Sequence, residues 1–250
     1  MFPSSAESHE HSLEILNALY EYDDFMESIR SLVDIGCGDG LDLEWWATRT
    51  TRDDRPEPLN IQCTGVDLER QLPMSRRYPN ITYQPMDFEE SIFPPKQGFD
   101  ILWCHNSFQY ALSPIATLSK WWHIAAPGAM LAIMIPQTTN VKQRQLEFTQ
   151  EDNCYYHYTL VNLIHMLAVN GWDCNNGFFK KTPNSPWISA IVYKSEVAPM
   201  NPKTTSWHTL SELKLLPETA DKSIHAHGYL RQEDLVLPWL DHNLIWMGKQ

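Results

Sequence analysis

Short apolar runs alternate with longer amphipathic stretches along most of the chain. Each run is bounded by turn-forming residues, as buried β-strands are, and the run at 129–135 is apolar on both faces, as in a central parallel strand. The longer stretches carry apolar residues at helical spacing. The predicted strands are Leu32–Ile35, Ile61–Val66, Ile81–Gln84, Phe99–Trp103, Ala129–Ile135, Gly177–Lys180 and Trp187–Lys194, and the predicted helices are Leu41–Thr50, Pro114–Ala125 and Thr159–Asn170.

This order of elements indicates an α/β fold. Alternating strands and helices predict a mostly parallel sheet with right-handed crossovers. The last two predicted strands are joined by the turn-rich segment TPNSP, so they can pair as an antiparallel hairpin.

We divide the chain into three parts: an N-terminal helical segment at 1–30, a main domain at 31–198 and a C-terminal extension at 199–250. Helical or strand periodicity is weak in the extension. However, Trp207, Trp239 and Trp246 make it too aromatic for a disordered tail. We therefore expect it to pack on the main domain, and we regard it as a candidate surface for a homodimer.

Composition narrows the class of partner. The chain has 31 acidic and 19 basic residues and a formal net charge of −12, which disfavours nucleic acid. The N-terminus lacks the features of a signal peptide, and no apolar stretch is long enough to span a bilayer. The 5 cysteines are widely spaced without a CxxC pair, which favours free thiols. We expect a soluble, cytoplasmic protein without a bound metal or membrane contact.

Glycine is scarce, yet three of the 10 glycines, Gly36, Gly38 and Gly40, fall in the segment LVDIGCGDG. This segment joins a predicted strand to a predicted helix, the position where open α/β sheets bind ligands. Glycine lets the backbone approach a ligand closely, and a helix start offers free N–H groups. The GxGxG spacing lacks the third glycine of the dinucleotide fingerprint, and no P-loop lysine follows.

The cluster resembles motif I of class I S-adenosylmethionine-dependent methyltransferases, especially small-molecule members, and further motifs follow in that family's order over about residues 31–136. The resemblance implies a Rossmann-like, doubly wound, mostly parallel seven-stranded sheet with a C-terminal antiparallel hairpin. It also implies that S-adenosyl-L-methionine is the cofactor and that Asp34 and the three glycines bind it.

Other cofactor residues follow from the same resemblance. Asp67, in CTGVDL, matches the acidic residue that bonds the ribose hydroxyls, because a carboxylate offers two acceptor oxygens. Asp87, in Met86–Phe88, matches the residue that accepts from the adenine amino group, with Leu68 covering the other face of the ring. Cys104, at the end of the fourth strand, completes the predicted cofactor set.

The segment FDILWCHNSFQYALSP, at 99–114, resembles the acceptor loop of small-molecule members that act on carboxylates. The resemblance assigns Asn106, Gln109 and Tyr110 to substrate binding. His105 is a candidate general base, or alternatively a hydrogen-bonded structural histidine.

Two further groups of histidines come from the sequence itself. His157 and Tyr156, in CYYHYT, are a candidate lid over the acceptor, with an interface or a helix entrance as the alternative. His9 and His11 have metal-like spacing without a third ligand, so we expect them on a flexible surface.

The predicted function is methyl transfer to a small molecule, with a carboxylate or hydroxyl oxygen favoured. A carboxylate needs no base, whereas a hydroxyl or amine would make His105 or His157 useful. Two alternatives stay open: methylation of a protein or RNA, and a catalytically silent S-adenosylmethionine-binding interaction protein.

Overall fold

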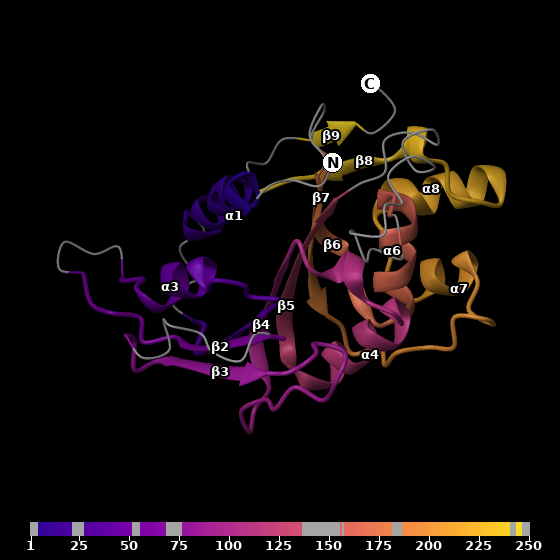
Figure 1. Cartoon of the computed structure of the whole chain (residues 1–250). Helices are drawn as coiled ribbons and strands as arrows, with labels where there is room; N and C mark the ends of the chain where they lie inside the picture. The colour runs from indigo at the N-terminus through magenta and orange to yellow at the C-terminus, as the bar shows by residue number, and fades with distance from the viewer. Residues whose placement is uncertain are drawn as a thin grey trace, which may run out of the picture.

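The computed structural model describes residues 5–21, 28–51, 56–68, 77–136, 156, 158–181, 187–240 and 244–246. A seven-stranded sheet lies at the centre of this part of the chain, with helices on both faces (Figure 1). The strands are β1 (Ser31–Ile35), β2 (Gln62–Asp67), β3 (Ile81–Pro85), β4 (Phe99–His105), β5 (Ala125–Pro136), β6 (Trp172–Lys181) and β7 (Trp187–Lys194). The main helices beside the sheet are α1 (Ser5–Tyr20), α3 (Leu41–Ala47), α4 (Pro114–Ile124) and α6 (Leu160–Val169).

The strand order is β3-β2-β1-β4-β5-β7-β6. The strands from β1 to β5 pair in parallel, and β7 is antiparallel to both β5 and β6. The predicted doubly wound sheet with a C-terminal hairpin is therefore confirmed. The chain direction across the sheet reverses between β1 and β4, so a crevice is expected at the carboxyl ends of these two strands.

Residues on β5 alternate between two hydrophobic cores. Leu131 and Ile133 belong to the core shared with α4 and α6. Ala132 and Met134 belong to the core shared with α1 and α3. Helices therefore cover both faces of this strand, which explains why it is apolar at successive positions (Figure 1).

Three predicted boundaries differ from the structure by three residues or more: the end of α3 and the starts of β5 and β6. Helix α3 ends at Ala47, because Thr50 has left the helix and pairs with Pro58 in an isolated β-bridge. Strand β6 begins earlier than predicted, at Trp172, because a register shift lets it continue across a polar stretch. Within that stretch, Asp173 Oδ1 accepts hydrogen bonds from the backbone N–H groups of Asn175 and Asn176.

Most of the described C-terminal region packs on the core of the sheet. Its elements are α7 (Trp207–Glu212), α8 (Glu218–His227), the 3-10 helix η3 (Gln232–Asp234), β8 (Val236–Pro238) and β9 (Leu244–Trp246). Leu210 and Ile224 are fully buried in the same core as α6. Leu237 and Trp239 are buried too, so these apolar side chains stabilise the chain itself. Within the described ranges, no helix combines the length and apolarity needed to cross a membrane.

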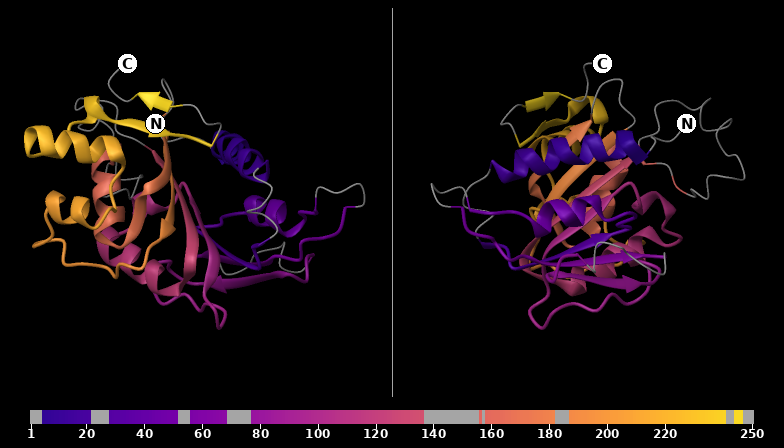
Figure 2. Two further views of the ribbon diagram at one scale, coloured as in Figure 1. Left: turned by 180° about the vertical axis from the view of Figure 1, so that it is seen from behind. Right: turned by 60° about the vertical axis from the view of Figure 1, so that its left-hand side comes forward.

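Helix α1 lies across α3 on one side of the sheet (Figure 2). Ile15, Leu16 and Leu19 are buried in the same core as Leu43 and Trp46. This apolar seam fixes the C-terminal half of α1, and the N-terminal half extends toward the carboxyl ends of β1 and β4.

Candidate active site

The chain leaves β1 through a tight turn at Gly36. The φ angle of Gly36 is 75°, and a Cβ atom at this position would lie 2.3 Å from the Cβ of Ser107. The Gly36 N–H donates a hydrogen bond of 2.8 Å to the Val66 carbonyl. The turn therefore packs against both β2 and the loop after β4, and neither the φ angle nor the space suits a larger residue.

Asp67, at the end of β2, contacts the same turn. Its Oδ2 accepts a hydrogen bond of 2.9 Å from the Gly38 N–H. The Met86 N–H donates a hydrogen bond of 2.9 Å to the Asp67 carbonyl. Three segments that were predicted separately to bind the cofactor are thus adjacent in the structure.

A cavity of about 240 Å³ lies beside this turn, at the carboxyl ends of β1 and β4. The predicted site residues that line it are Asp34, Gly36, Gly38, His105 and Asn106. The remaining lining residues are His9, Ser12, Cys37, Asp39, Leu41 and Asp42. The contribution of α1 was not predicted from the sequence, where its one signal is the pair of histidines near the N-terminus.

Asp34 is the most deeply buried acidic group of the cavity lining, with 3% of its surface exposed. Burial raises the pKa of its carboxyl well above the usual value, and the negative charges of Asp42 and Asp67 raise it further. The carboxyl group is therefore easier to protonate than an exposed one, and a nearby positive charge would oppose this shift.

His11 and His105 form a buried pair beside the cavity. His11 Nδ1 lies 3.1 Å from His105 Nε2, and the His11 ring stacks on Trp187 with a centroid distance of 4.9 Å. Both histidines are 9% exposed, so the expectation of a flexible surface is wrong for His11. This burial arises from a contact between β4 and α1, so no local sequence motif predicts it.

The pKa values of both imidazoles are lowered by burial. For His11 the pKa falls to about 4, with opposing effects from Glu14, which raises it, and Lys180, which lowers it. For His105 the pKa falls to about 3, and the neighbouring His11 and His9 lower it further. Both rings are therefore neutral at physiological pH.

Asp42, on α3, links α1 to the sheet. Its Oδ1 accepts a hydrogen bond of 2.5 Å from Ser12 Oγ, and its Oδ2 accepts one of 2.8 Å from Trp103 Nε1. His9 Nδ1 lies 3.4 Å from Asp42 Oδ1. The carboxylate thus fixes the N-terminal half of α1 beside the cavity.

The residues predicted to hold the adenine lie outside the lining of this cavity. Asp87 Oδ1 accepts a hydrogen bond of 2.9 Å from the Glu89 N–H, so the carboxylate also caps a turn. Phe88 packs against Trp121, with ring centroids 6.1 Å apart. Leu68 is 73% exposed. These positions extend outward from Asp67, beyond the glycine turn.

The predicted acceptor residues lie in different surroundings. Asn106 has a φ of 55° and lines the cavity, and Gln109 Nε2 donates a hydrogen bond of 2.8 Å to its Oδ1. Gln109 is 1% exposed, so it positions Asn106 from below the surface. Tyr110 is partly exposed. Tyr156 Oη donates a hydrogen bond of 3.1 Å to the Leu112 carbonyl.

Gly40 and Cys104 are further predicted site residues outside the cavity lining that the structure describes. Cys104 is fully buried, with Sγ 3.1 Å from Ser107 Oγ, so it supports the loop beside the glycine turn. His157 lies outside the described residues.

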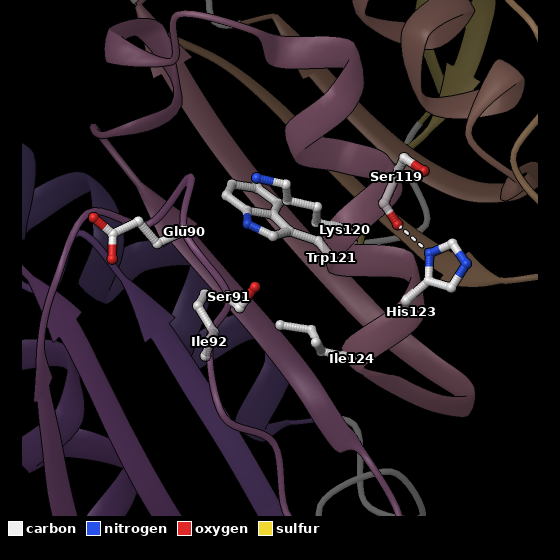
Figure 3. A pocket seen from close by; sticks show the side chains of 8 residues that line it. All are labelled: Glu90, Ser91, Ile92, Ser119, Lys120, Trp121, His123 and Ile124. Carbon is white, nitrogen blue, oxygen red and sulfur yellow. Dashed lines mark hydrogen bonds between the residues drawn. The ribbon is translucent and has the colours of Figure 1, made fainter.

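A second cavity, of about 320 Å³, lies between α4 and the segment after β3 (Figure 3). Among its lining residues, His123 Nδ1 pairs with the Ser119 carbonyl of its own helix at 2.7 Å, and Trp121 is 1% exposed. None of the predicted site residues lines it. The smaller cavity is the better candidate active site, because it lies where the strand order reverses and contains the glycine turn.

A family model described as "Methyltransferase domain" matches residues 33–133, from β1 to β5. No curated protein matches the sequence. Among solved structures, Burkholderia thailandensis 1,6-didemethyltoxoflavin-N1-methyltransferase, bound to 1,6-didemethyltoxoflavin and S-adenosylhomocysteine, is 13% identical with a TM-score of 0.50. That match covers 78% of this chain and 94% of the other.

Two further solved structures have the same fold. An S-adenosylmethionine-dependent methyltransferase from Archaeoglobus fulgidus is 15% identical with a TM-score of 0.52, covering 72% of this chain and 93% of that one. Haemonchus contortus phosphoethanolamine N-methyltransferase 2 is 14% identical with a TM-score of 0.53, covering 72% of this chain and 53% of that one. Residues 33–133 therefore match a methyltransferase domain, and the chain has the fold of these solved methyltransferase structures.

Proposed function

We propose that the chain transfers a methyl group from S-adenosylmethionine to an oxygen atom, carboxylate or hydroxyl, of a small molecule. The observation that carries this proposal is the glycine turn, held by Asp67 beside a cavity at the carboxyl ends of β1 and β4. The cofactor supplies a methyl group already activated on a positively charged sulfur. The protein therefore has to bind and orient the cofactor and the acceptor, and it has to exclude water.

The acidic residues of the site fit a positively charged cofactor. The buried Asp34 carboxyl lines the cavity together with Asp42, and a nearby cation would lower the raised pKa of Asp34. Asp67 already accepts from Gly38, and a carboxylate can accept further hydrogen bonds from ribose hydroxyls. Asp87, with Met86 and Phe88, is assigned to the adenine side.

Acceptor binding is assigned to the side of the cavity formed by the loop after β4. Asn106 offers an amide to the acceptor, and Gln109 fixes that amide. His105 lines the cavity next to Asn106 and is the candidate base. Tyr110 and Tyr156 extend the assigned acceptor side outward.

A small acceptor is supported by the position of α1. His9 and Ser12 line the cavity from α1, and the cavity volume is only about 240 Å³. A side chain of a protein or a base of an RNA would have to pass α1 to reach His105. Two proteins of similar structure, a didemethyltoxoflavin methyltransferase and a phosphoethanolamine methyltransferase, are also named for small molecules.

Isothermal titration tests the cofactor assignment. We expect S-adenosylmethionine and S-adenosylhomocysteine to bind the full chain, and Asp67→Ala to weaken binding by about tenfold or more, the equivalent of one charge-assisted hydrogen bond. Glu218→Gln, at an exposed position on α8, is the matched control and should leave binding unchanged. Absence of binding to the wild-type chain would contradict the proposal.

A second experiment tests the acceptor class. The full chain is incubated with tritiated S-adenosylmethionine and a size-fractionated cell extract. We expect label in the small-molecule fraction. Label in protein or RNA would support a macromolecular acceptor, and cofactor binding without transfer to any fraction would support the catalytically silent alternative.

A further inference from the structure

Glu89 lies in the adenine-side segment, residues 86–90, and its side chain has no role in the site described above. Both of its carboxylate oxygens bind the loop that follows β4, here called the acceptor loop, residues 106–113. Oε2 accepts a hydrogen bond of 2.7 Å from the Leu112 N–H, and Oε1 accepts one of 2.9 Å from the Ser113 N–H. The carboxylate therefore joins the segment assigned to the cofactor to the loop assigned to the acceptor.

The turn that carries Glu89 also carries Asp87. Asp87 Oδ1 accepts a hydrogen bond of 2.9 Å from the Glu89 N–H, and the Asp87 carbonyl accepts one of 2.9 Å from the Glu90 N–H. A ligand bound to the Asp87 carboxylate therefore acts on the same turn that directs the Glu89 side chain. A shift of this turn reaches the acceptor loop through that one side chain.

Leu112 is held by polar contacts on both sides of its backbone. Its N–H donates to Glu89, and its carbonyl accepts a hydrogen bond of 3.1 Å from Tyr156 Oη. Its side chain is 59% exposed, so apolar burial does little to fix this end of the acceptor loop. The backbone of Leu112 thus connects Glu89 to Tyr156, which is assigned to the acceptor, and it follows Tyr110, which has the same assignment, by two positions.

The inner part of the acceptor loop is held by packing instead. Phe108 and Ala111 are fully buried, and Phe108 contacts Trp121 of α4 with ring centroids 5.4 Å apart. Removal of the Glu89 carboxylate should therefore leave this inner part in place and release only the outer end of the loop. The position of the outer end can thus be changed without unfolding the sheet.

A cap on α4 is the alternative role for Glu89, because that helix begins at Pro114. A capping side chain accepts hydrogen bonds from the N–H groups of the first helical turn. The N–H groups that Glu89 binds belong to Leu112 and Ser113, which precede this turn. The Thr117 hydroxyl, which donates a hydrogen bond of 2.8 Å to Oε1, is a contact within the helix. Capping therefore does not account for the two backbone hydrogen bonds to the acceptor loop.

The charge of Glu89 suits it to accept at both oxygens. Burial raises the pKa of its carboxyl, but three hydrogen bonds to the carboxylate and the nearby charge of Lys120 outweigh this, so the pKa lies below its usual value. The group is therefore ionised at neutral pH, and an ionised carboxylate offers two acceptor oxygens.

We propose that Glu89 is a positioning residue that couples the cofactor site to the acceptor loop, so that S-adenosylmethionine bound at Asp87 stabilises the arrangement of the loop that binds the acceptor. This inference rests on the proposed function and adds a preferred order to it, in which the cofactor binds first and the acceptor second. By linkage, a bound acceptor strengthens cofactor binding by the same factor.

Hydrogen exchange tests the coupling without knowledge of the acceptor. Exchange of the backbone amides at 110–117 is measured in the full chain with and without S-adenosylhomocysteine. We expect the ligand to slow this exchange in the wild type. In Glu89→Ala the amides of Leu112 and Ser113 should exchange faster under both conditions, and the slowing by the ligand should be lost. Glu90→Ala, which removes the adjacent and exposed glutamate, is the matched control and should behave as the wild type.

A merely structural role of Glu89 gives a different result in this experiment. Exchange would then be faster in Glu89→Ala, but the ligand would slow it as much as in the wild type. That outcome would overturn the coupling. A wild-type chain that binds S-adenosylhomocysteine without slower exchange at 110–117 would overturn it as well.

Transfer assays test the acceptor side. Tritiated S-adenosylmethionine is supplied at a saturating concentration, and the small-molecule fraction of a cell extract is supplied at a series of dilutions. We expect Glu89→Ala to need about tenfold more of the fraction for half-maximal transfer, the equivalent of one charge-assisted hydrogen bond. Glu89→Gln keeps one acceptor oxygen and should lie between Glu89→Ala and the wild type, and Glu90→Ala should match the wild type. An unchanged half-maximal dilution in Glu89→Ala would overturn the positioning role.

Titration with S-adenosylhomocysteine separates this role from failure of the proposed function. Glu89→Ala and the wild type should bind it with similar affinity, because the carboxylate is directed at the acceptor loop. A loss of affinity as large as the loss on the acceptor side would mean that Glu89 acts through the cofactor alone, and it would overturn the coupling. Absence of binding to the wild type would instead refute the cofactor assignment. Binding without transfer by the wild type would contradict methyl transfer, while hydrogen exchange would still decide the role of Glu89.

Discussion

The two walls of the cavity differ in how the sequence builds them. The wall formed by the glycine turn comes from consecutive residues between β1 and α3, joined by Gly38 to Asp67. The wall formed by α1 comes from the N-terminus, where Ser12 is bound to Asp42 and His11 to His105. The first wall depends on backbone conformation, and the second depends on side-chain contacts between distant segments.

This difference determines which substitutions each wall tolerates. The glycine turn tolerates almost no added volume at Gly36, because the turn packs directly on Ser107 there. The α1 wall is held by a few hydrogen bonds over an apolar seam, so single polar changes can loosen it without unfolding the sheet. The following predictions test the comparison.

The largest effect is expected in the glycine turn. Gly36→Ala would place a Cβ 2.3 Å from the Ser107 Cβ at a φ of 75°, so we expect a loss of about 3 kcal/mol or more in the free energy of unfolding. Gly38→Ala is the matched control: its φ is also positive, at 49°, but no heavy atom lies within 4 Å of the added Cβ. It should cost only about 1 kcal/mol.

Urea denaturation of the two variants measures this difference. Equal destabilisation would mean that the positive φ alone, and not the close approach of Ser107, makes alanine unfavourable in the turn. Titration with S-adenosylhomocysteine then shows whether Gly38→Ala, which leaves the packing intact, affects cofactor binding on its own.

The next effect is expected where α1 meets α3. Asp42→Ala removes the acceptor for both Ser12 Oγ and Trp103 Nε1, so we expect a loss of about 2 kcal/mol and faster hydrogen exchange in the N-terminal half of α1. Asp39→Ala, an exposed change on the same cavity, is the control and should leave exchange in α1 unchanged. Similar exchange rates in the two variants would show that the apolar seam alone holds α1.

The sequence predicted the sheet and the glycine wall because their signals are local. Apolar runs mark strands, and the positive φ at Gly36 is a local backbone conformation that glycine adopts readily. Asp67 was predicted because the family resemblance places an acidic residue at the end of the next strand. The register shift in β6 and the bridge at Thr50 were missed, since both depend on partners elsewhere in the chain.

The α1 wall could not be predicted in the same way. His11 and His105 are far apart in sequence, and a histidine near the N-terminus has no periodic or motif signal that marks it as buried. Its burial depends on Trp187, at the start of β7, and on the side chains of α3 beneath α1. Tertiary contacts of this kind appear only once the fold brings the segments together.

The smallest effect is the pH dependence of stability that the histidines of the α1 wall add. The pKa of His11 is lowered from 6.5 to about 4, and that of His105 from 6.5 to about 3, so the unfolded chain binds more protons than the folded chain between these values. Stability is therefore fully present above pH 6.5 and is lost as the pH falls toward 4. From pH 6.5 to pH 5 each histidine should contribute a loss of at most about 2 kcal/mol.

His11→Asn removes one of these titrating groups and keeps a hydrogen-bonding side chain on α1, so its unfolding free energy should depend less on pH than that of the wild type between pH 6.5 and 5. Denaturation of both chains at a series of pH values measures this difference, and His123→Asn, in which an exposed histidine is removed, serves as the control. Titration of the carboxyl groups in the glycine wall affects all three chains alike, so its contribution cancels from the comparison. Identical pH dependence in His11→Asn and the wild type would mean that His11 is protonated in the folded chain as readily as in the unfolded one, and the buried neutral pair would then be excluded.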